Sequence, residues 1–169
     1  MKAYNNYEVY IIDRETRENI LALAEPAKKS DLIGLKGKGW NFNWSDISRS
    51  AEIVYKITLG ENLQGLIAFF EDPDKQAIHA INAEVAPYNL GSKSQGYVVG
   101  PTLFALVAKH SIDRGWGGYV FLEAKTRLIP YYTEKLGARL TMPPKGMSLD
   151  EDQANALVDR YIVKEAIKC

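Results

Sequence analysis

The residues from Gln95 to Thr102 have the composition of an anion-binding turn. The segment Gln95-Gly96-Tyr97-Val98-Val99-Gly100 leads into Pro101 and Thr102, and the apolar residues that follow are spaced as in a helix. A turn that enters a helix directs backbone N–H groups and the positive end of the helix dipole toward whatever lies above it. We therefore predict that an anion of the phosphate type binds at this turn.

Two titratable residues, His79 and Glu84, lie on the predicted strand that precedes the turn and ends at Pro87. Strand alternation groups His79 with Ile81, Ala83 and Val85, and Glu84 with Ile78, Ala80 and Asn82. The unperturbed pKa of a histidine suits a base near neutral pH. We expect His79 and Glu84 to face opposite sides of the sheet unless a bulge changes the alternation.

Strands in an antiparallel meander are the elements that should position these residues. Three apolar runs follow one another, with turn residues between them: Glu52–Leu59, Leu63–Phe70 and Ala77–Val85. Short turns of this kind join antiparallel neighbours. The N-terminal part predicts a strand over Glu8–Asp13 and then a helix that begins at Arg14 and ends before Pro26.

The second half of the chain predicts a crossover. Leu103, Leu106, Val107 and His110 share one helical face, and the helix should end at Gly115. The next strand, Tyr119–Leu122, follows a helical connection from the strand that ends at Pro87. The two strands are therefore expected to be parallel and to form a right-handed βαβ unit.

The C-terminal part predicts a helix over Leu128–Leu136, a strand over Arg139–Met142 and a loop over Pro143–Asp152. The last segment, Ala156–Ala166, fits either a strand or a helix. Its β-forming residues favour a strand.

An aromatic segment precedes the meander. Residues 27–50 are polar and contain several glycines, yet carry Trp40, Phe42 and Trp44 close together. These rings either cover the edge of the core or form a wall of a substrate cleft, since loops held by a scaffold often carry binding residues.

Length and composition predict one domain, residues 1–169, with a substantial core. Lys and Arg together number 21, as do Asp and Glu, so no overall charge favours nucleic acid or an anionic membrane. The single cysteine, Cys169, excludes an internal disulfide and suggests a reducing compartment. The sequence has no apolar segment of membrane-spanning length. We expect a cytoplasmic protein.

The order of these elements and motifs resembles the GNAT superfamily of acyl-CoA-dependent N-acetyltransferases. The resemblance is strongest from Gly65 to Leu140, and four pieces carry it: Val85-Ala86-Pro87, the turn Gln95–Gly100, the strand Val120–Ala124, and Tyr131-Tyr132-Thr133-Glu134-Lys135-Leu136-Gly137. It implies an α/β (α+β) fold with a mixed, mostly antiparallel central sheet flanked by helices. Within that sheet, two parallel strands would splay apart.

The resemblance also implies acetyl-CoA as co-substrate and no metal. The residues expected to contact it are Gln95, Gly96, Tyr97, Val98, Val99, Gly100 and Thr102 at the pyrophosphate, and Val85 and Ala86 beside the pantetheine and thioester. Val98 stands where the family usually has its first glycine. A strand N–H near Val85 would polarise the thioester carbonyl, as an oxyanion hole does.

An amine would attack the thioester directly, so the resemblance implies a base and an acid. Tyr132 is the candidate acid for the departing thiolate, with Tyr131 as its neighbour on the helix. His79 and Glu84 are alternative candidates for the base, and Trp40 and Trp44 are expected in the acceptor site. Deprotonation by bulk water is a third route.

Three functions remain open. The first is acetylation of an amine on a small molecule, peptide or protein, and the second is a GNAT-like module that binds acyl-CoA without catalysis. The third, acetylation of a charged RNA, rests only on the lysines of the aromatic segment, which are Lys28, Lys29, Lys36 and Lys38. The oligomeric state is open too, with a homodimer as the common arrangement in similar proteins.

Overall fold

The computed structural model describes residues 4–51, 53–90, 96–123, 139–142 and 146–164. The predicted helix at Leu128–Leu136, with Tyr131 and Tyr132, lies outside these residues, as does Gln95.

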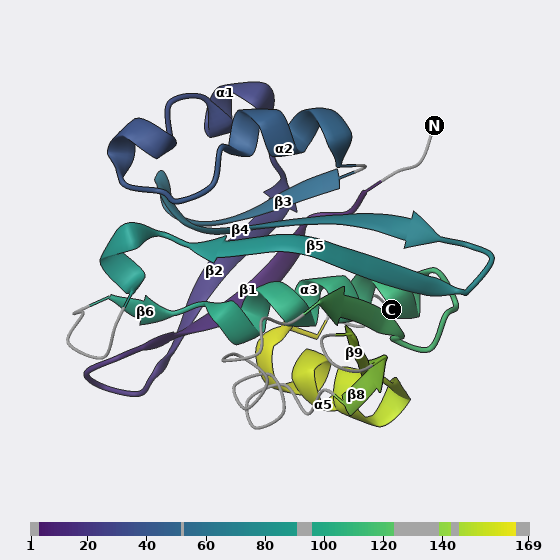
Figure 1. The fold of residues 1–169 in the computed structure, drawn as a ribbon. Coiled ribbons are helices and arrows are strands. Elements are labelled where there is room, and N and C mark those ends of the chain that lie inside the picture. The colour runs from purple at the N-terminus through teal and green to yellow at the C-terminus, as the bar shows by residue number, and fades with distance from the viewer. Residues whose placement is uncertain (1–3, 52, 91–95, 124–138, 143–145, 165–169) are drawn as a thin grey trace.

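Nine strands in the described part of the chain form one sheet, in the order β6-β1-β2-β3-β4-β5-β7-β9-β8 (Figure 1). Their bounds are β1 Tyr7–Asp13, β2 Asn19–Pro26, β3 Ile53–Leu59, β4 Asn62–Asp72, β5 Ala77–Val85, β6 Tyr97–Val98, β7 Val120–Glu123, β8 Arg139–Met142 and β9 Gly146–Leu149. The pairs are antiparallel except β5–β7, which is parallel in the register Ile78↔Val120, His79↔Phe121 and Ala80↔Leu122. The mixed, mostly antiparallel sheet with one parallel pair is confirmed.

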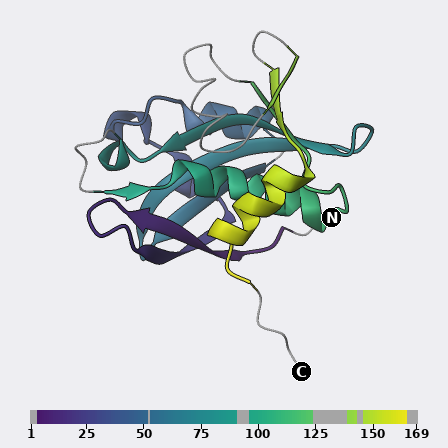
Figure 2. The ribbon, with the colours of Figure 1, turned by 90° about the horizontal axis from the view of Figure 1, so that it is seen from below.

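Helices cover both faces of this sheet. On one face lie α1 (Lys29–Leu32), the 3-10 turn η1 (Lys36–Lys38) and α2 (Trp44–Ser50); on the other lie α3 (Gly100–Asp113) and α5 (Glu151–Tyr161) (Figures 1 and 2). A second 3-10 turn, η2 (Pro87–Asn89), follows β5. None of the helices in the described part of the chain is both long and apolar enough to cross a membrane.

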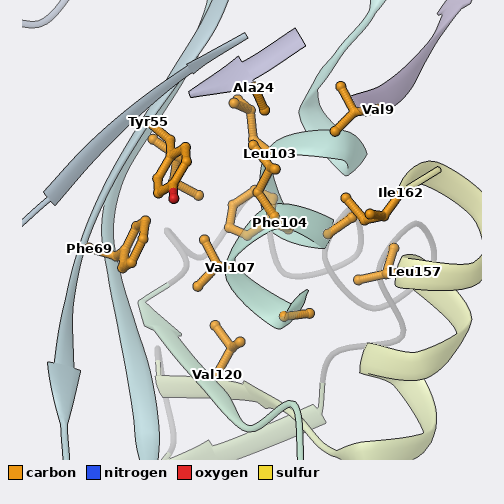
Figure 3. Packing of buried hydrophobic residues seen from close by; sticks show 14 of the residues in the cluster. Val9, Ala24, Tyr55, Phe69, Leu103, Phe104, Val107, Val120, Leu157 and Ile162 are labelled. Atoms are coloured by element: carbon orange, nitrogen blue, oxygen red, sulfur yellow. The ribbon is translucent and has the colours of Figure 1, made fainter. Parts of the chain in front are cut away.

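The main core lies between the sheet and the α3–α5 layer. Leu103, Phe104 and Val107 of α3 pack against strand residues such as Tyr55 and Phe69 (Figure 3). Most of α3 is buried, from Pro101 to Ala108 without interruption, because α5 covers the side of α3 that the sheet leaves open. The start of α3 is thereby fixed against the sheet.

The predicted helix from Arg14 to Pro26 is wrong, because the structure has the β1–β2 hairpin there. Ala22 and Ala24 are buried while Leu21 and Leu23 are exposed, which is the period-2 pattern of a strand. A short run of alternating alanine and leucine satisfies both periods, and the pairing of β2 with β1 and β3 decides between them.

The C-terminal prediction also needs two corrections. Strand β9 occupies part of the predicted loop, and the preferred strand is the helix α5. Asp150 caps α5 by accepting hydrogen bonds from the backbone N–H groups of Asp152 and Gln153. The buried Ala154 and Leu157 then face the core. The capping box, and not β propensity, determines this segment.

The aromatic segment is more ordered than a loop, since α1, η1 and α2 lie within it. Trp40 and Trp44 belong to a second hydrophobic cluster with Leu66 and Ala68 of β4 and Ala86 at the end of β5. The alternative that these rings cover an edge of the core is therefore correct for their packing.

Candidate active site

A bulge in β5 sets which residues face which helix layer. Phe69 pairs with Ala80 and Ala68 pairs with Asn82, so the register skips Ile81. His79 and Glu84 consequently pair with Phe70 and Leu66, which lie on the same face of β4. His79 and Glu84 therefore face the same side of the sheet, which is the exception allowed for in the sequence analysis, because a bulge shifts the alternation by one residue.

His79 nevertheless lies far from the expected thioester. Six residues separate it from Val85, which corresponds to about 20 Å along a strand. Its Nε2 is 2.9 Å from Asp72 Oδ2, and its ring stacks on Phe70 with 4.5 Å between centroids. The bond to His79 is the main cause that lowers the pKa of the Asp72 carboxyl. The structure thus places His79 in a pair of its own at the other end of β5.

Glu84 lies beside the expected thioester, but its carboxylate is engaged. It accepts hydrogen bonds from the backbone N–H of Asn41 (2.6 Å), the backbone N–H of Phe42 (3.2 Å) and Trp44 Nε1 (2.8 Å). Glu84 as a whole is only 9% exposed. These bonds hold the segment before α2 against β5, which is the arrangement of a positioning residue.

The end of β5 presents a backbone edge toward β7. The Ala86 N–H donates to Gln64 O on the β4 side, and successive N–H groups of a strand point to opposite edges. The N–H of Val85 therefore points toward the β7 side. In the described residues, the β5–β7 pairing extends no further than Ala80, so this N–H lies beyond the paired region.

The start of α3 packs directly over this strand end. Gly65 pairs with Val85, and a Cβ on Gly65 would lie 3.0 Å from Val99 Cγ1 and 3.3 Å from Leu103 Cδ1. Val99 is the N-cap of α3, and its side chain makes no capping hydrogen bond. Pro101 has no N–H, and the N–H groups of Thr102 and Leu103 donate to Val99 O, so the positive end of the helix dipole is what this N-terminus offers an anion. The Gly65–Val85 pair thus brings the start of α3 and the end of β5 together.

The predicted turn has an extended start. Tyr97 and Val98 form β6, which pairs with Asp13 and Ile12 of β1. A β-branched residue suits an extended backbone, so Val98 fits here without a left-handed conformation. Gly96 and Gly100 flank this pair, half-buried. Thr102 is buried, and its hydroxyl donates to Tyr10 O (2.8 Å), so this hydroxyl anchors α3 to β1.

Asn89 was missed by the sequence analysis and holds the turn in place. Its Nδ2 donates to Gln64 Oε1 (3.0 Å), and its Oδ1 accepts from the Tyr97 N–H (2.8 Å). Arg14 donates from Nη2 to Asn89 O (2.7 Å). Asn89 is fully buried. Gln64 and Arg14 are distant from Asn89 in sequence, and Tyr97 is eight residues away, so the Pro-Tyr-Asn segment itself carried no signal of this role.

A cavity of about 460 Å³ opens beside the strand end, on the face that α1 and α2 cover. Trp40 lines it, together with Pro87 and Tyr88 of η2. Trp44 does not line it: this ring is 1% exposed and faces Glu84. Of the two predicted acceptor-site tryptophans, the structure places Trp40 at a cavity and Trp44 within the packing behind it.

Comparisons with known proteins agree with this geometry at the level of fold. No family model and no curated protein sequence matches the chain. Among solved structures, it is similar to an acetyltransferase of Bacillus subtilis in complex with CoA, with a TM-score of 0.52, 14% identity and 75% of this chain and 97% of that chain covered.

Two further structures are similar over more of the chain. A putative acetyltransferase of T. thermophilus has a TM-score of 0.57, 12% identity and coverage of 94% of this chain and 96% of that chain. A structure described as a bacterial toxin has a TM-score of 0.58, 14% identity and coverage of 82% and 95%. The chain has the fold of the GNAT acetyltransferases.

Proposed function

We propose that the protein transfers an acetyl group from acetyl-CoA to an amine by direct attack in a ternary complex. The observation that carries this proposal is the meeting of the α3 N-terminus with the end of β5 at the Gly65–Val85 pair. A helix N-terminus suits the pyrophosphate. The Val85 N–H, directed toward the β7 side of β5, suits the oxygen of the thioester.

The acceptor would approach from the α1–α2 face, where the cavity beside Tyr88 lies. His79 is too distant and Glu84 too engaged to favour either as the base, so the proposal assigns proton removal to water at the cavity mouth. Tyr132 remains the proposed acid for the thiolate. Its replacement, Tyr132→Phe, should lower kcat far more than the affinity for acetyl-CoA.

Isothermal titration with acetyl-CoA tests the cofactor assignment. We expect binding by the wild type and loss of binding by Gly100→Trp, since an indole at the first residue of α3 would fill the pyrophosphate position. Gly37→Trp is the matched control, because the space around Gly37 is open and it lies in η1, on the other face. Absence of acetyl-CoA binding by the wild type would overturn the proposal.

A non-catalytic acyl-CoA-binding module is the second candidate. The engagement of Glu84 by three donors favours it, because no other carboxylate of β5 lies near the strand end. Release of free CoA in the presence of a panel of amines separates the two: turnover with any amine supports the transferase, and tight binding without turnover supports the module.

A further inference from the structure

The cavity beside η2 is lined by more acidic than basic side chains. Its lining includes three carboxylates, of Glu25, Asp31 and Glu61, but two ammonium groups, of Lys38 and Lys56. Lys56 is shared between two of the carboxylates, with Nζ 3.5 Å from Glu25 Oε1 and 2.9 Å from Asp31 Oδ2. One ammonium thus serves two acids, which leaves this wall of the cavity with an excess negative charge.

These charged groups are partly buried, so solvent weakens their fields less than it would on an open surface. The side chain of Lys56 is 13% exposed, and those of Asp31 and Glu25 are 25% and 30% exposed. Burial raises the pKa of Asp31, but the Lys28 N–H and the Lys56 ammonium outweigh this and lower it. The Asp31 carboxylate is therefore ionised at neutral pH.

The register fixes how far this wall lies from the strand end. Glu25 pairs with Lys56, Lys56 with Leu66, and Leu66 with Glu84. These residues form one row across β2, β3, β4 and β5. Because neighbouring strands lie about 4.8 Å apart, Lys56 is roughly 10 Å from the end of β5. Two further groups that line the cavity, Trp40 and Leu63, are apolar.

We propose that this cavity binds the remote ammonium group of an aliphatic diamine or longer oligoamine at Glu25 and Asp31. The apolar lining contacts its methylene chain, and its second amine lies at the end of β5. Only the role of that second amine, as the acetyl acceptor, rests on the proposed function. A diol of equal length lacks the charge that the carboxylates recognise.

Titration of three probes in the absence of acetyl-CoA tests this inference. They are 1,8-diaminooctane, 1,8-octanediol and octanedioic acid, which are matched in length and differ in the charge of both end groups. We expect the diamine to bind roughly tenfold more tightly than the diol, the effect of one partly buried ion pair. The dicarboxylic acid should bind most weakly.

Two variants change the excess negative charge of the cavity: Glu25→Gln lowers it and Lys56→Gln raises it. Glu25→Gln should remove most of the diamine preference, whereas Lys56→Gln should increase it, because both carboxylates are then left to the ligand. Asp46→Asn is the matched control, since Asp46 lies on α2, outside the cavity, and pairs with Arg49. Thermal unfolding of each variant checks that the fold is kept.

Equal affinity of the wild type for the diamine and the diol would overturn the inference, and so would a diamine preference that Glu25→Gln leaves unchanged. Either result is distinguishable from failure of the proposed function, because acetyl-CoA binding is measured separately and Gly100→Trp leaves the cavity intact. A diamine preference without acetyl-CoA binding would keep the cavity assignment and remove the transferase.

Discussion

At the scale of single residues, Glu84 connects the two halves of the site. A carboxylate that accepts three hydrogen bonds holds the segment from Asn41 to Trp44 against β5. A buried acceptor removed from its donors leaves those donors unsatisfied, which costs roughly 1–3 kcal/mol. Glu84 is therefore expected to act on the acceptor side through the position of this segment.

The replacement Glu84→Gln tests this role, since a carboxamide offers only one acceptor oxygen to three donors. We expect a lower free energy of unfolding and a higher KM for the acceptor amine, with acetyl-CoA affinity unchanged. Glu15→Gln, an exposed carboxamide substitution on the β1–β2 turn, is the control. Loss of the acidic limb of the pH–rate profile in Glu84→Gln, without a change in KM, would instead identify Glu84 as the base.

His110 lies in the last turn of α3, and its burial should make the stability of the fold depend on pH. Its Nε2 is 2.7 Å from Glu71 Oε1, which also accepts from Arg114 Nε, and the His110 side chain is 4% exposed. Burial lowers the pKa of His110, and it outweighs the hydrogen bond to Glu71, which raises it. The folded state therefore binds a proton at His110 less readily than the unfolded chain.

The sign follows from proton linkage. As pH falls below about 6.5, the unfolded chain takes up a proton that the folded state does not, so the contribution of His110 lowers stability. The slope is at most about 1.4 kcal/mol per pH unit for one proton. Urea unfolding at pH 7.5 and 5.5 should show this loss in the wild type and a smaller loss in His110→Gln. An equal loss in both proteins would refute the assignment.

At the scale of elements, the contact of α5 with the loop after α3 depends on one glycine. Gly118 has φ +89, and a Cβ there would lie 2.4 Å from the Cβ of Ala154 in α5. Gly117 has φ +68 but open space around it. Substitution of Gly117 therefore tests backbone strain alone, whereas substitution of Gly118 tests strain together with steric overlap.

Gly118→Ala should destabilise the protein by roughly 2–4 kcal/mol, because left-handed strain and overpacking add. Gly117→Ala should cost only about 1 kcal/mol, from strain alone. Thermal and urea unfolding of both variants measure the difference. Equal destabilisation would mean that α5 moves away from the loop without cost.

At the scale of the whole molecule, the two faces of the sheet carry different parts of the candidate site, and both parts lie near the end of β5. The α3 face holds the helix N-terminus over the Gly65–Val85 pair, and the α1–α2 face holds the cavity beside Tyr88. The end of β5, which lies beyond its pairing with β7 in the described residues, joins the two faces. In the proposed reaction, the co-substrate and the acceptor would approach the Val85 backbone from different sides.

The sequence by itself determined the parts whose signals are local. Ala77–Val85 and Arg139–Met142 are strands as predicted, and the helix after the turn ends before Gly115, which has a positive φ. Periodicity, turn residues and a crossover of sufficient length fix these elements without reference to the rest of the chain. The order of the motifs was enough to predict the GNAT fold and the parallel β5–β7 pair.

Only the tertiary structure decided the features that depend on distant partners. The bulge at Ile81 exists because β5 pairs with β4, and it places His79 and Glu84 on the same face of the sheet. The donors that engage Glu84 lie about forty residues away in sequence, and those around Asn89 belong to three other segments. A hydrogen bond between residues this far apart leaves no periodicity in the sequence, so residue types alone identify candidates for chemistry and the packed chain decides which of them are already engaged.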